Sequence, residues 1–240
     1  MDDTREGYKE LPSLNKIISN LARLRRRKET MQKVVPAILT KDPSLLKDQL
    51  DALKNHTKWV QIDIMDGKFV PAVSVNISEL GEASQFFNLE IHLMVKNPEN
   101  YLEDCNAVGA KRVYFHLTGT EDPRVTLSLM EKYSFQRGIA INPETTVNQL
   151  APYVKSADAV LILSVVPGEQ GHEFIPSVTE KALQIRSFAP DVLIGMDGGI
   201  AKDNITKVFK GGVDYVAVGS SIWKTEDPIA SLKELGEMVR

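Results

Sequence analysis

From residue 34 onward, short apolar runs alternate with longer segments in which apolar positions recur at helical spacing. The runs of strand length are residues 34–39, 59–65, 89–95, 112–117, 138–142, 159–165, 192–196 and 215–219. The amphipathic helical segments are residues 44–55, 77–87, 98–108, 123–133, 147–155, 176–188, 203–210 and 228–239. Eight strands that are each followed by a helix predict an α/β protein, and eight such units close naturally into a parallel (β/α)8 TIM barrel. No Gly-x-Gly-x-x-Gly pattern follows an early strand, so we favour this barrel over an open doubly wound sheet for residues 34–240.

Residues 1–33 differ from the rest of the chain. One apolar stripe at helical spacing runs through them, made of Leu14, Ile17, Ile18, Leu21 and Leu24. Arg25 to Lys28 then place cations near the end of the expected helix. Acidic residues precede the basic ones and there is no apolar core region, so neither a secretory signal nor a transit peptide is expected. We interpret residues 1–33 as an N-terminal helical extension that packs on the barrel or on a neighbouring subunit, in preference to a nucleic-acid or membrane contact.

The composition is typical of a globular protein, with 42% hydrophobic and 25% charged residues. A net charge of -3 gives no electrostatic reason to expect nucleic acid or an anionic membrane as a partner. No apolar run approaches the roughly 18 residues that a membrane span needs. The single cysteine, Cys105, excludes an internal disulfide and favours a cytoplasmic location; its helical spacing predicts a small buried hydrophobic residue.

Candidate chemistry begins in the second expected strand. Gln61, Asp63 and Met65 alternate along it, so their side chains share one face. An acidic side chain in a strand with apolar flanks is costly to bury unless a metal, a proton or a hydrogen-bond donor meets it. A partner for Asp63 is therefore expected nearby.

His92 and Asp197 are the expected neighbours of Asp63. In such barrels the reactive groups lie at the C-terminal ends of the strands, which would bring Asp63, His92 and Asp197 to one mouth. This set can bind a divalent metal, or it can place two carboxyls on opposite faces of a substrate for proton transfer, and the two uses are compatible. We interpret His56 and His172 as structural and leave His116 unassigned.

Two glycine-containing loops indicate an anion site. Gly198 and Gly199 follow the seventh strand, and Gly219 and Ser220 follow the eighth. Glycines there let backbone N–H groups approach a ligand, and phosphate is often held between these two loops. The alternative is that the glycines only permit tight turns. Because both loops carry such residues, we favour a phosphate site over glycines that only permit tight turns.

Six motifs in chain order resemble ribulose-phosphate 3-epimerase: residues 63–71, 90–95, 142–143, 164–168, 196–200 and 219–220. The resemblance covers residues 34–240 and implies an enzyme that inverts the carbon beside the ketone of a phosphorylated ketose through an enediolate. The expected reaction converts D-ribulose 5-phosphate to D-xylulose 5-phosphate, although close relatives act on other ketose phosphates such as allulose 6-phosphate. We also expect a homo-oligomer.

The resemblance implies roles for individual residues. Asp63 and Asp197 match the acid and the base. The substrate-binding positions match His92, Met65, Met94, Gly168, Glu169, Gln170, Gly171, Gly198, Gly199, Gly219 and Ser220. A divalent metal (Zn, Mn, Fe, Co or Mg) would be bound by Asp63, His92 and Asp197, with Gln61 at the first ligand position.

Three departures from the family pattern affect these expectations. Gln61 replaces a histidine ligand, and because an amide oxygen suits harder ions than zinc, metal binding should be weaker, shifted toward manganese or magnesium, or absent. Ala37 replaces a serine that contacts substrate, and Glu169 places a negative charge in the expected phosphate loop. One alternative is a catalytically reduced barrel that binds a sugar phosphate or a protein without turnover. Another is a related decarboxylase or aldolase, but that enzyme would require a lysine where Gln61 and Met65 stand.

Overall fold

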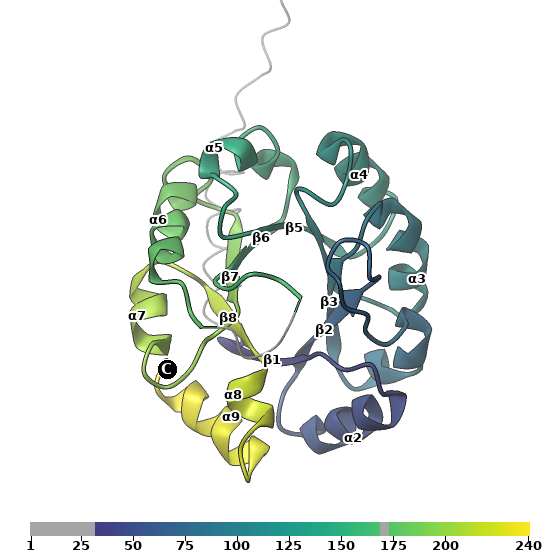
Figure 1. The fold of residues 1–240 in the computed structure, drawn as a ribbon, viewed down its shortest axis with the longest axis vertical. Coiled ribbons are helices and arrows are strands. Elements are labelled where there is room, and N and C mark those ends of the chain that lie inside the picture. Colours follow the sequence, from purple (N-terminus) through teal and green to yellow (C-terminus); the bar gives the residue numbers. More distant parts are fainter. Residues whose placement is uncertain (1–31, 169–172) are drawn as a thin grey trace, which may run out of the picture. The chain divides into compact units, whose positions relative to one another are not determined.

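The computed structural model describes residues 32–168 and 173–240, and it confirms the expected TIM barrel. Parallel strands pair in chain order, and β1 closes the ring by pairing with β8. The strands are β1 (Val34–Ile38), β2 (Trp59–Met65), β3 (Asn88–Met94), β4 (Arg112–His116), β5 (Gln136–Ile141), β6 (Ala159–Leu163), β7 (Leu193–Asp197) and β8 (Tyr215–Val218). The helices surround this ring (Figure 1). The apolar stripe of the expected N-terminal helix lies outside the described residues.

The helices of this ring differ in length and regularity. They are α2 (Pro43–Leu53), α3 (Leu102–Ala107), α4 (Pro123–Met130), α5 (Val147–Leu150), α6 (Thr179–Phe188), α7 (Ile205–Lys210), α8 (Ser220–Trp223) and α9 (Pro228–Glu237). Three of them begin in the same way, because Asp42, Asp122 and Asp227 each accept a hydrogen bond from a first-turn N–H and a proline follows.

The sequence did not predict every helix correctly. The single helix expected over residues 77–87 is wrong: the segment forms two 3-10 helices, η1 (Ile77–Leu80) and η2 (Ala83–Gln85). Gly81 ends the first of them with φ of 48°, a left-handed conformation that interrupts a regular helix. Other helical segments begin or end with a 3-10 helix, namely η3 (Pro98–Tyr101), η4 (Val154–Ser156) and η5 (Pro176–Val178). Helix α8 was not expected.

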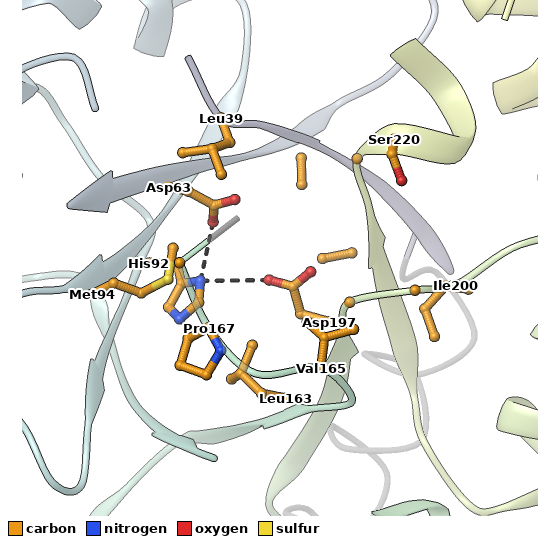
Figure 2. A pocket seen from close by; sticks show the side chains of 16 residues that line it. Leu39, Asp63, His92, Met94, Leu163, Val165, Pro167, Asp197, Ile200 and Ser220 are labelled. Carbon is orange, nitrogen blue, oxygen red and sulfur yellow. Dashed lines mark hydrogen bonds and ion pairs between the residues drawn. The ribbon is translucent and has the colours of Figure 1, made fainter. Parts of the chain in front are cut away.

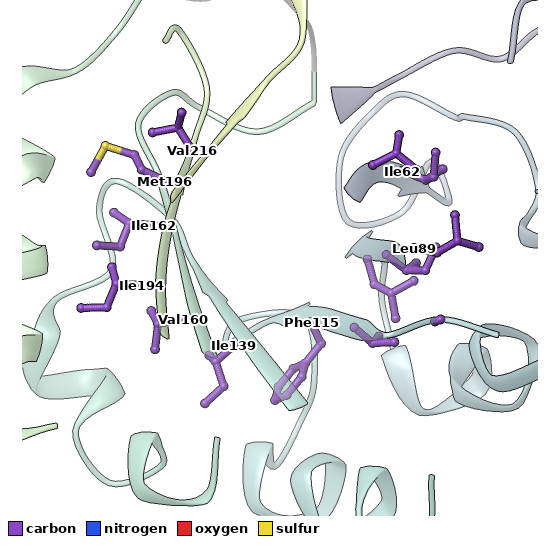
Figure 3. Packing of buried hydrophobic residues seen from close by; sticks show 14 of the residues in the cluster. Ile62, Leu89, Phe115, Ile139, Val160, Ile162, Ile194, Met196 and Val216 are labelled. Atoms are coloured by element: carbon purple, nitrogen blue, oxygen red, sulfur yellow. The ribbon is translucent and has the colours of Figure 1, made fainter. Parts of the chain in front are cut away.

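The main hydrophobic core lies between the strands and the helices. Alternate residues of each strand point outward into it, such as Val60, Ile62 and Ile64 on β2 (Figure 3 shows Ile62). Cys105, on α3, is fully buried in this core, as expected. The residues between these outward positions face the barrel interior and are available to form a site.

No helix in the described part of the chain combines the length and apolarity needed to cross a membrane.

A polar cluster fills the N-terminal end of the barrel interior, which we call the barrel floor: Trp59, Glu90, Arg112, Tyr114 and Tyr215. Arg112 Nη1 donates to Glu90 Oε2 at 2.5 Å, and the guanidinium stacks 4.5 Å from the centre of the Trp59 ring. The hydroxyl of Tyr215 donates to Glu90 at 2.9 Å and lies 2.8 Å from the hydroxyl of Tyr114. A buried ion pair of this kind is tolerated because every charged group has a partner.

Two glycines make room for this floor. A Cβ atom on Gly138 would lie 2.1 Å from the ring of Tyr114, and one on Gly195 would lie 2.5 Å from the ring of Tyr215. Because no side chain can occupy that space, the large tyrosines on β4 and β8 are paired with the smallest residue on the neighbouring strands β5 and β7. Packing at the floor is therefore specified by size as well as polarity.

Candidate active site

The structure brings Asp63, His92 and Asp197 together at the C-terminal mouth of the barrel. They come from β2, β3 and β7, and Asp63 is paired with His92 in strand register. Each occupies an inward-facing position. Figure 2 shows both carboxylates turned toward the same central space beside the imidazole. One ligand atom from each residue lies within 4.8 Å of the others, so the expected convergence is confirmed in space.

The three side chains are connected by hydrogen bonds. His92 Nδ1 lies 3.0 Å from Asp63 Oδ1 and 3.5 Å from Asp197 Oδ2. His92 is fully buried, while Asp63 and Asp197 are 7% and 9% exposed. One imidazole nitrogen therefore faces both carboxylates at the bottom of an otherwise accessible mouth.

Gln61 provides a second bridge between the carboxylates. Its Nε2 donates to Asp63 Oδ1 at 2.8 Å and to Asp197 Oδ2 at 2.7 Å. Its Oε1 is buried and has no hydrogen-bond partner among the described residues. The sequence predicted Gln61 on the same strand face as Asp63. It did not predict the bond to Asp197, which is 136 residues away in the chain.

His116 is a site residue that the sequence left unassigned. It is buried at the end of β4, and its Nε2 lies 2.8 Å from Nε2 of His92. Strand alternation alone indicates that the His116 side chain faces the barrel interior, because His116 lies two residues beyond the inward-facing Tyr114. The contact with His92 needed the three-dimensional structure.

The surroundings set the charge of each group. Burial alone would lower the pKa of His92, but its hydrogen bonds to Asp197 and Asp63 raise that pKa to about 9. Burial raises the pKa of Asp63, the bond from His92 opposes this rise, and the charge of Asp197 adds to it. Burial and the nearby charge of His92 hold the pKa of His116 well below its usual value.

These shifts fix the direction of the hydrogen bond between the two imidazoles. A protonated His92 donates from Nε2 to the neutral ring of His116. The proton of His116 then lies on Nδ1, and a hydrogen bond to the side chain of Asn142 partly opposes the lowering of the His116 pKa. Because burial and a neighbouring carboxylate both disfavour ionised Asp63, the two carboxyls are suited to opposite protonation states, one acid and one base.

A cavity that is open to solvent lies above these groups. The expected site residues that line it are Asp63, His92, Met94, Gly168, Asp197, Gly198, Gly199, Gly219 and Ser220. Ala37 also lines it. Met65 lies beside it in a small apolar cluster with Met94 and Val70, whereas Gln61 is buried beneath it. The other expected positions, Glu169, Gln170 and Gly171, lie outside the described residues, as does His172.

The loops after β7 and β8 form one wall of the cavity. Gly198 and Gly199 have φ of 105° and 62°, conformations that favour glycine. Ser221 Oγ donates to the carbonyl of Ile200 at 2.7 Å and joins the two loops. Among the described residues that line the cavity there is no lysine or arginine. An anion at this wall would therefore be held by backbone N–H groups, including those at the start of α8.

The donor set fits a divalent metal. Two carboxylates and one imidazole are ordinary ligands for such ions, and their atoms are close enough to share one. His92 could present a neutral Nδ1 while its Nε2–H bonds to His116, and such a bond from the second ring nitrogen fixes the orientation of a metal-binding imidazole. Gln61 would contribute its Oε1 only after its amide rotated, because Nε2 now faces the carboxylates.

Comparisons with known proteins identify the family of this chain. A sequence model of the ribulose-phosphate 3 epimerase family matches residues 33–223. The chain is 30% identical to ribulose-phosphate 3-epimerase of Mycobacterium tuberculosis, over 84% of this chain and 90% of that one. It is also 30% identical to the enzyme of that name from Aquifex aeolicus, over 87% and 97%. The Bacillus subtilis enzyme of that name is 29% identical, over 85% of this chain and 98% of that one.

Solved structures support the fold independently. A 3-hexulose-6-phosphate synthase aligns with a TM-score of 0.67 at 15% identity, covering 87% of this chain and all of that one. An orotidine 5'-phosphate decarboxylase from Pyrococcus horikoshii aligns with a TM-score of 0.64 at 13% identity, covering 86% and 99%. At these identities only the barrel is shared. The sequence matches, in contrast, span nearly the whole barrel, and the chain belongs to the ribulose-phosphate 3-epimerase family of carbohydrate isomerases.

Proposed function

We propose that this chain inverts C3 of D-ribulose 5-phosphate and produces D-xylulose 5-phosphate. The observation that carries the proposal is the pair of carboxylates, Asp63 and Asp197, which face one cavity from β2 and β7. Family membership supports the same chemistry. A binding-only barrel would have no need for two acids held at one position.

The reaction requires one ionised and one protonated carboxyl. The ionised carboxylate removes the C3 proton from one face of the ketose, and the electron pair moves into an enediolate. The protonated carboxyl then delivers its proton to C3 from the opposite face, and the ketone re-forms. The two side chains finish with exchanged protonation states. Because burial raises the pKa of Asp63, we assign the proton of the resting site to Asp63 and the base to Asp197.

The protein must also stabilise negative charge on the enediolate oxygens. The imidazolium of His92 lines the cavity beside the two carboxylates and is the nearest positive charge for this purpose. When a divalent metal is bound, it supplies additional electrostatic stabilisation of this charge. Asp63, His92 and Asp197 would hold it, and the amide at position 61 favours manganese or magnesium over zinc.

The remaining cavity suits the rest of the substrate. The phosphate would lie at the wall built by Gly198, Gly199, Gly219 and Ser220, where backbone N–H groups replace basic side chains. Met94, with Met65 beside it, would form the apolar side of the pocket. The side chain of Ala37 offers no hydrogen bond to a substrate, so recognition of the sugar hydroxyls depends on the carboxylates and His92. A homo-oligomer stays a prediction.

The test is conversion of purified full-length protein with D-ribulose 5-phosphate, followed by NMR detection of D-xylulose 5-phosphate. Parallel reactions contain D-allulose 6-phosphate or unphosphorylated D-ribulose. We expect the pentulose phosphate to react fastest and the unphosphorylated sugar to react at least about 100-fold more slowly, because phosphate binding positions C3 between the acids. Faster conversion of D-allulose 6-phosphate would show that this sugar phosphate, and not D-ribulose 5-phosphate, is the preferred substrate. No conversion of any ketose phosphate, with or without added metal, would favour the binding-only alternative.

A further inference from the structure

We propose that Gln61 is a positioning residue that holds the two carboxylates ready for proton transfer without a divalent ion. The inference rests on the proposed epimerase function and concerns the side chain that replaces the expected histidine ligand. Gln61 does not line the cavity, so it acts through Asp63 and Asp197 and has no contact with C3.

The first argument is geometric. One nitrogen, Gln61 Nε2, is within 2.8 Å of an oxygen of Asp63 and 2.7 Å of an oxygen of Asp197. An amide NH2 group has two hydrogens, so each carboxylate receives one of them. Both bonds are charge-assisted when the carboxylates are ionised, and such bonds are stronger than neutral ones. The amide thereby occupies the bridging position that an ion would otherwise take between the two acids.

The orientation of the amide follows from its neighbours. With Oε1 facing the carboxylates, the ionised Asp197 would meet a second oxygen with no hydrogen between them, which is strongly unfavourable. With Nε2 facing them, two bonds form and Oε1 is left buried without a partner. The site accepts the cost of that unpartnered oxygen, which indicates how strongly the two carboxylates determine the orientation.

The same orientation opposes metal binding. A metal ligand needs a lone pair, and the Nε2 of an amide has none to offer. For Gln61 to bind an ion, its amide must rotate by half a turn and break both bonds to the carboxylates. A bridging amide and a coordinating amide are therefore mutually exclusive states. A histidine at position 61 would carry no such conflict, because a neutral imidazole can direct a lone pair toward the ion.

Metal binding provides a test that does not depend on activity. Calorimetric titrations of the chelator-treated full-length protein with Zn²⁺ and Mn²⁺ are compared between the native protein and Gln61→His. We expect Gln61→His to bind Zn²⁺ at least about tenfold more tightly, because it restores an imidazole ligand and removes the competing amide. Gln49→His is the matched control, since it makes the same change on the outer helix α2. Equal Zn²⁺ affinity in the native protein and Gln61→His would overturn the proposal.

The bridging amide has its own spectroscopic signature. In ¹⁵N-edited NMR spectra, the side-chain NH2 of Gln61 is assigned from the signal that disappears in Gln61→Met. We expect these protons to be shifted downfield and slow to exchange with solvent in the metal-free protein. Fast exchange, like that of a solvent-exposed glutamine, would contradict the bridge. Gln49→Met, the same substitution on α2, is the control: signals of other residues that shift in both variants do not report on the bridge.

Turnover in the presence of excess chelator completes the test. We expect native turnover to be preserved, Gln61→His to lose at least about tenfold in kcat, and Gln61→Met to lose kcat with little change in KM. Restoration of native turnover only by added metal would refute the inference while leaving the epimerase function intact. Absence of turnover under all conditions would refute the proposed function instead, and the titrations and NMR spectra would still decide whether Gln61 bridges the acids.

Discussion

The two ends of the barrel interior solve the problem of buried polar groups in different ways. At the floor, Glu90 is bonded by Arg112 and Tyr215, and Arg112 also donates from Nε to Gln136 at 2.8 Å. At the mouth, Gln61 Oε1 is buried with no hydrogen-bond partner among the described residues. A fully bonded network stabilises and rigidifies, whereas unpartnered atoms are a cost that stability alone does not explain.

This contrast assigns a different purpose to each end. Residues at the floor should be needed for folding and have little effect on the chemical step. Residues at the mouth should be needed for turnover, and replacing them should change kcat much more than it changes the free energy of unfolding. The predictions below test this division, beginning with the largest expected effect.

Asp197→Asn should lower kcat by about 10²- to 10⁴-fold, because it removes one of the two groups that transfer a proton at C3. We expect the free energy of unfolding to change much less than kcat, because asparagine keeps the size of the side chain. Steady-state kinetics and denaturant titration measure the two quantities. The control is Asp191→Asn, the same change at an exposed position just before β7. An active Asp197→Asn variant would remove Asp197 from the mechanism.

Arg112→Met should lower the free energy of unfolding by about 3–5 kcal/mol, because it leaves Glu90 buried without its cation. Lys202→Met is the comparison: Lys202 pairs with Glu234, but both side chains are 54% exposed, so we expect a loss of about 1 kcal/mol or less. Denaturant titration measures both variants. Similar losses in the two proteins would contradict the structural role of the floor, as would an Arg112→Met protein of native stability with impaired kcat.

Gly195→Ala should cost about 1–3 kcal/mol, because the added methyl group would lie 2.5 Å from the ring of Tyr215. Gly236→Ala on α9 is the matched control, since its Cβ would have no atom within 4 Å. We expect that variant to be neutral or slightly more stable, because alanine favours helix over glycine. Thermal unfolding of the two proteins distinguishes the cases. A tolerated Gly195→Ala would mean that the floor is packed more loosely than described.

The last prediction concerns the pH dependence of stability at the mouth. The pKa of His92 is raised in the folded protein from 6.5 to about 9, so its stabilising contribution is complete below pH 6.5 and lost as the pH rises through 9. In metal-free samples, the difference in unfolding free energy between native protein and His92→Gln should therefore shrink from pH 6.5 to pH 9.5. A constant or growing difference would show that His92 is not held as a cation by the two acids.

The sequence predicted the part of the site that follows from strand periodicity. Asp63, His92 and Asp197 occupy inward positions at strand ends, and in a closed parallel barrel such positions must converge. The bridge from Gln61 to Asp197 could not be predicted in this way. It depends on the curvature of the closed barrel, which decides how far a side chain on β2 reaches toward β7.

Local conformation explains the other differences. The apolar spacing of residues 77–87 suited a helix, but a left-handed glycine at position 81 divides the segment into two 3-10 helices. The role of His116 depends on a contact with His92 across neighbouring strands, and periodicity placed its side chain inside the barrel without naming its partner. Periodicity thus predicts which way a side chain faces, while pairing between side chains requires coordinates.

The most direct measurement is the isotope content of C3 during the first few per cent of reaction with D-ribulose 5-phosphate in heavy water. With Asp63 and Asp197 on opposite faces, the group that donates a proton to C3 is a different one from the group that removed it. The D-xylulose 5-phosphate formed should therefore carry deuterium at C3, while unreacted substrate keeps its proton. Product that retains the original proton would mean that one group acts on both faces, and it would contradict the two-carboxylate mechanism.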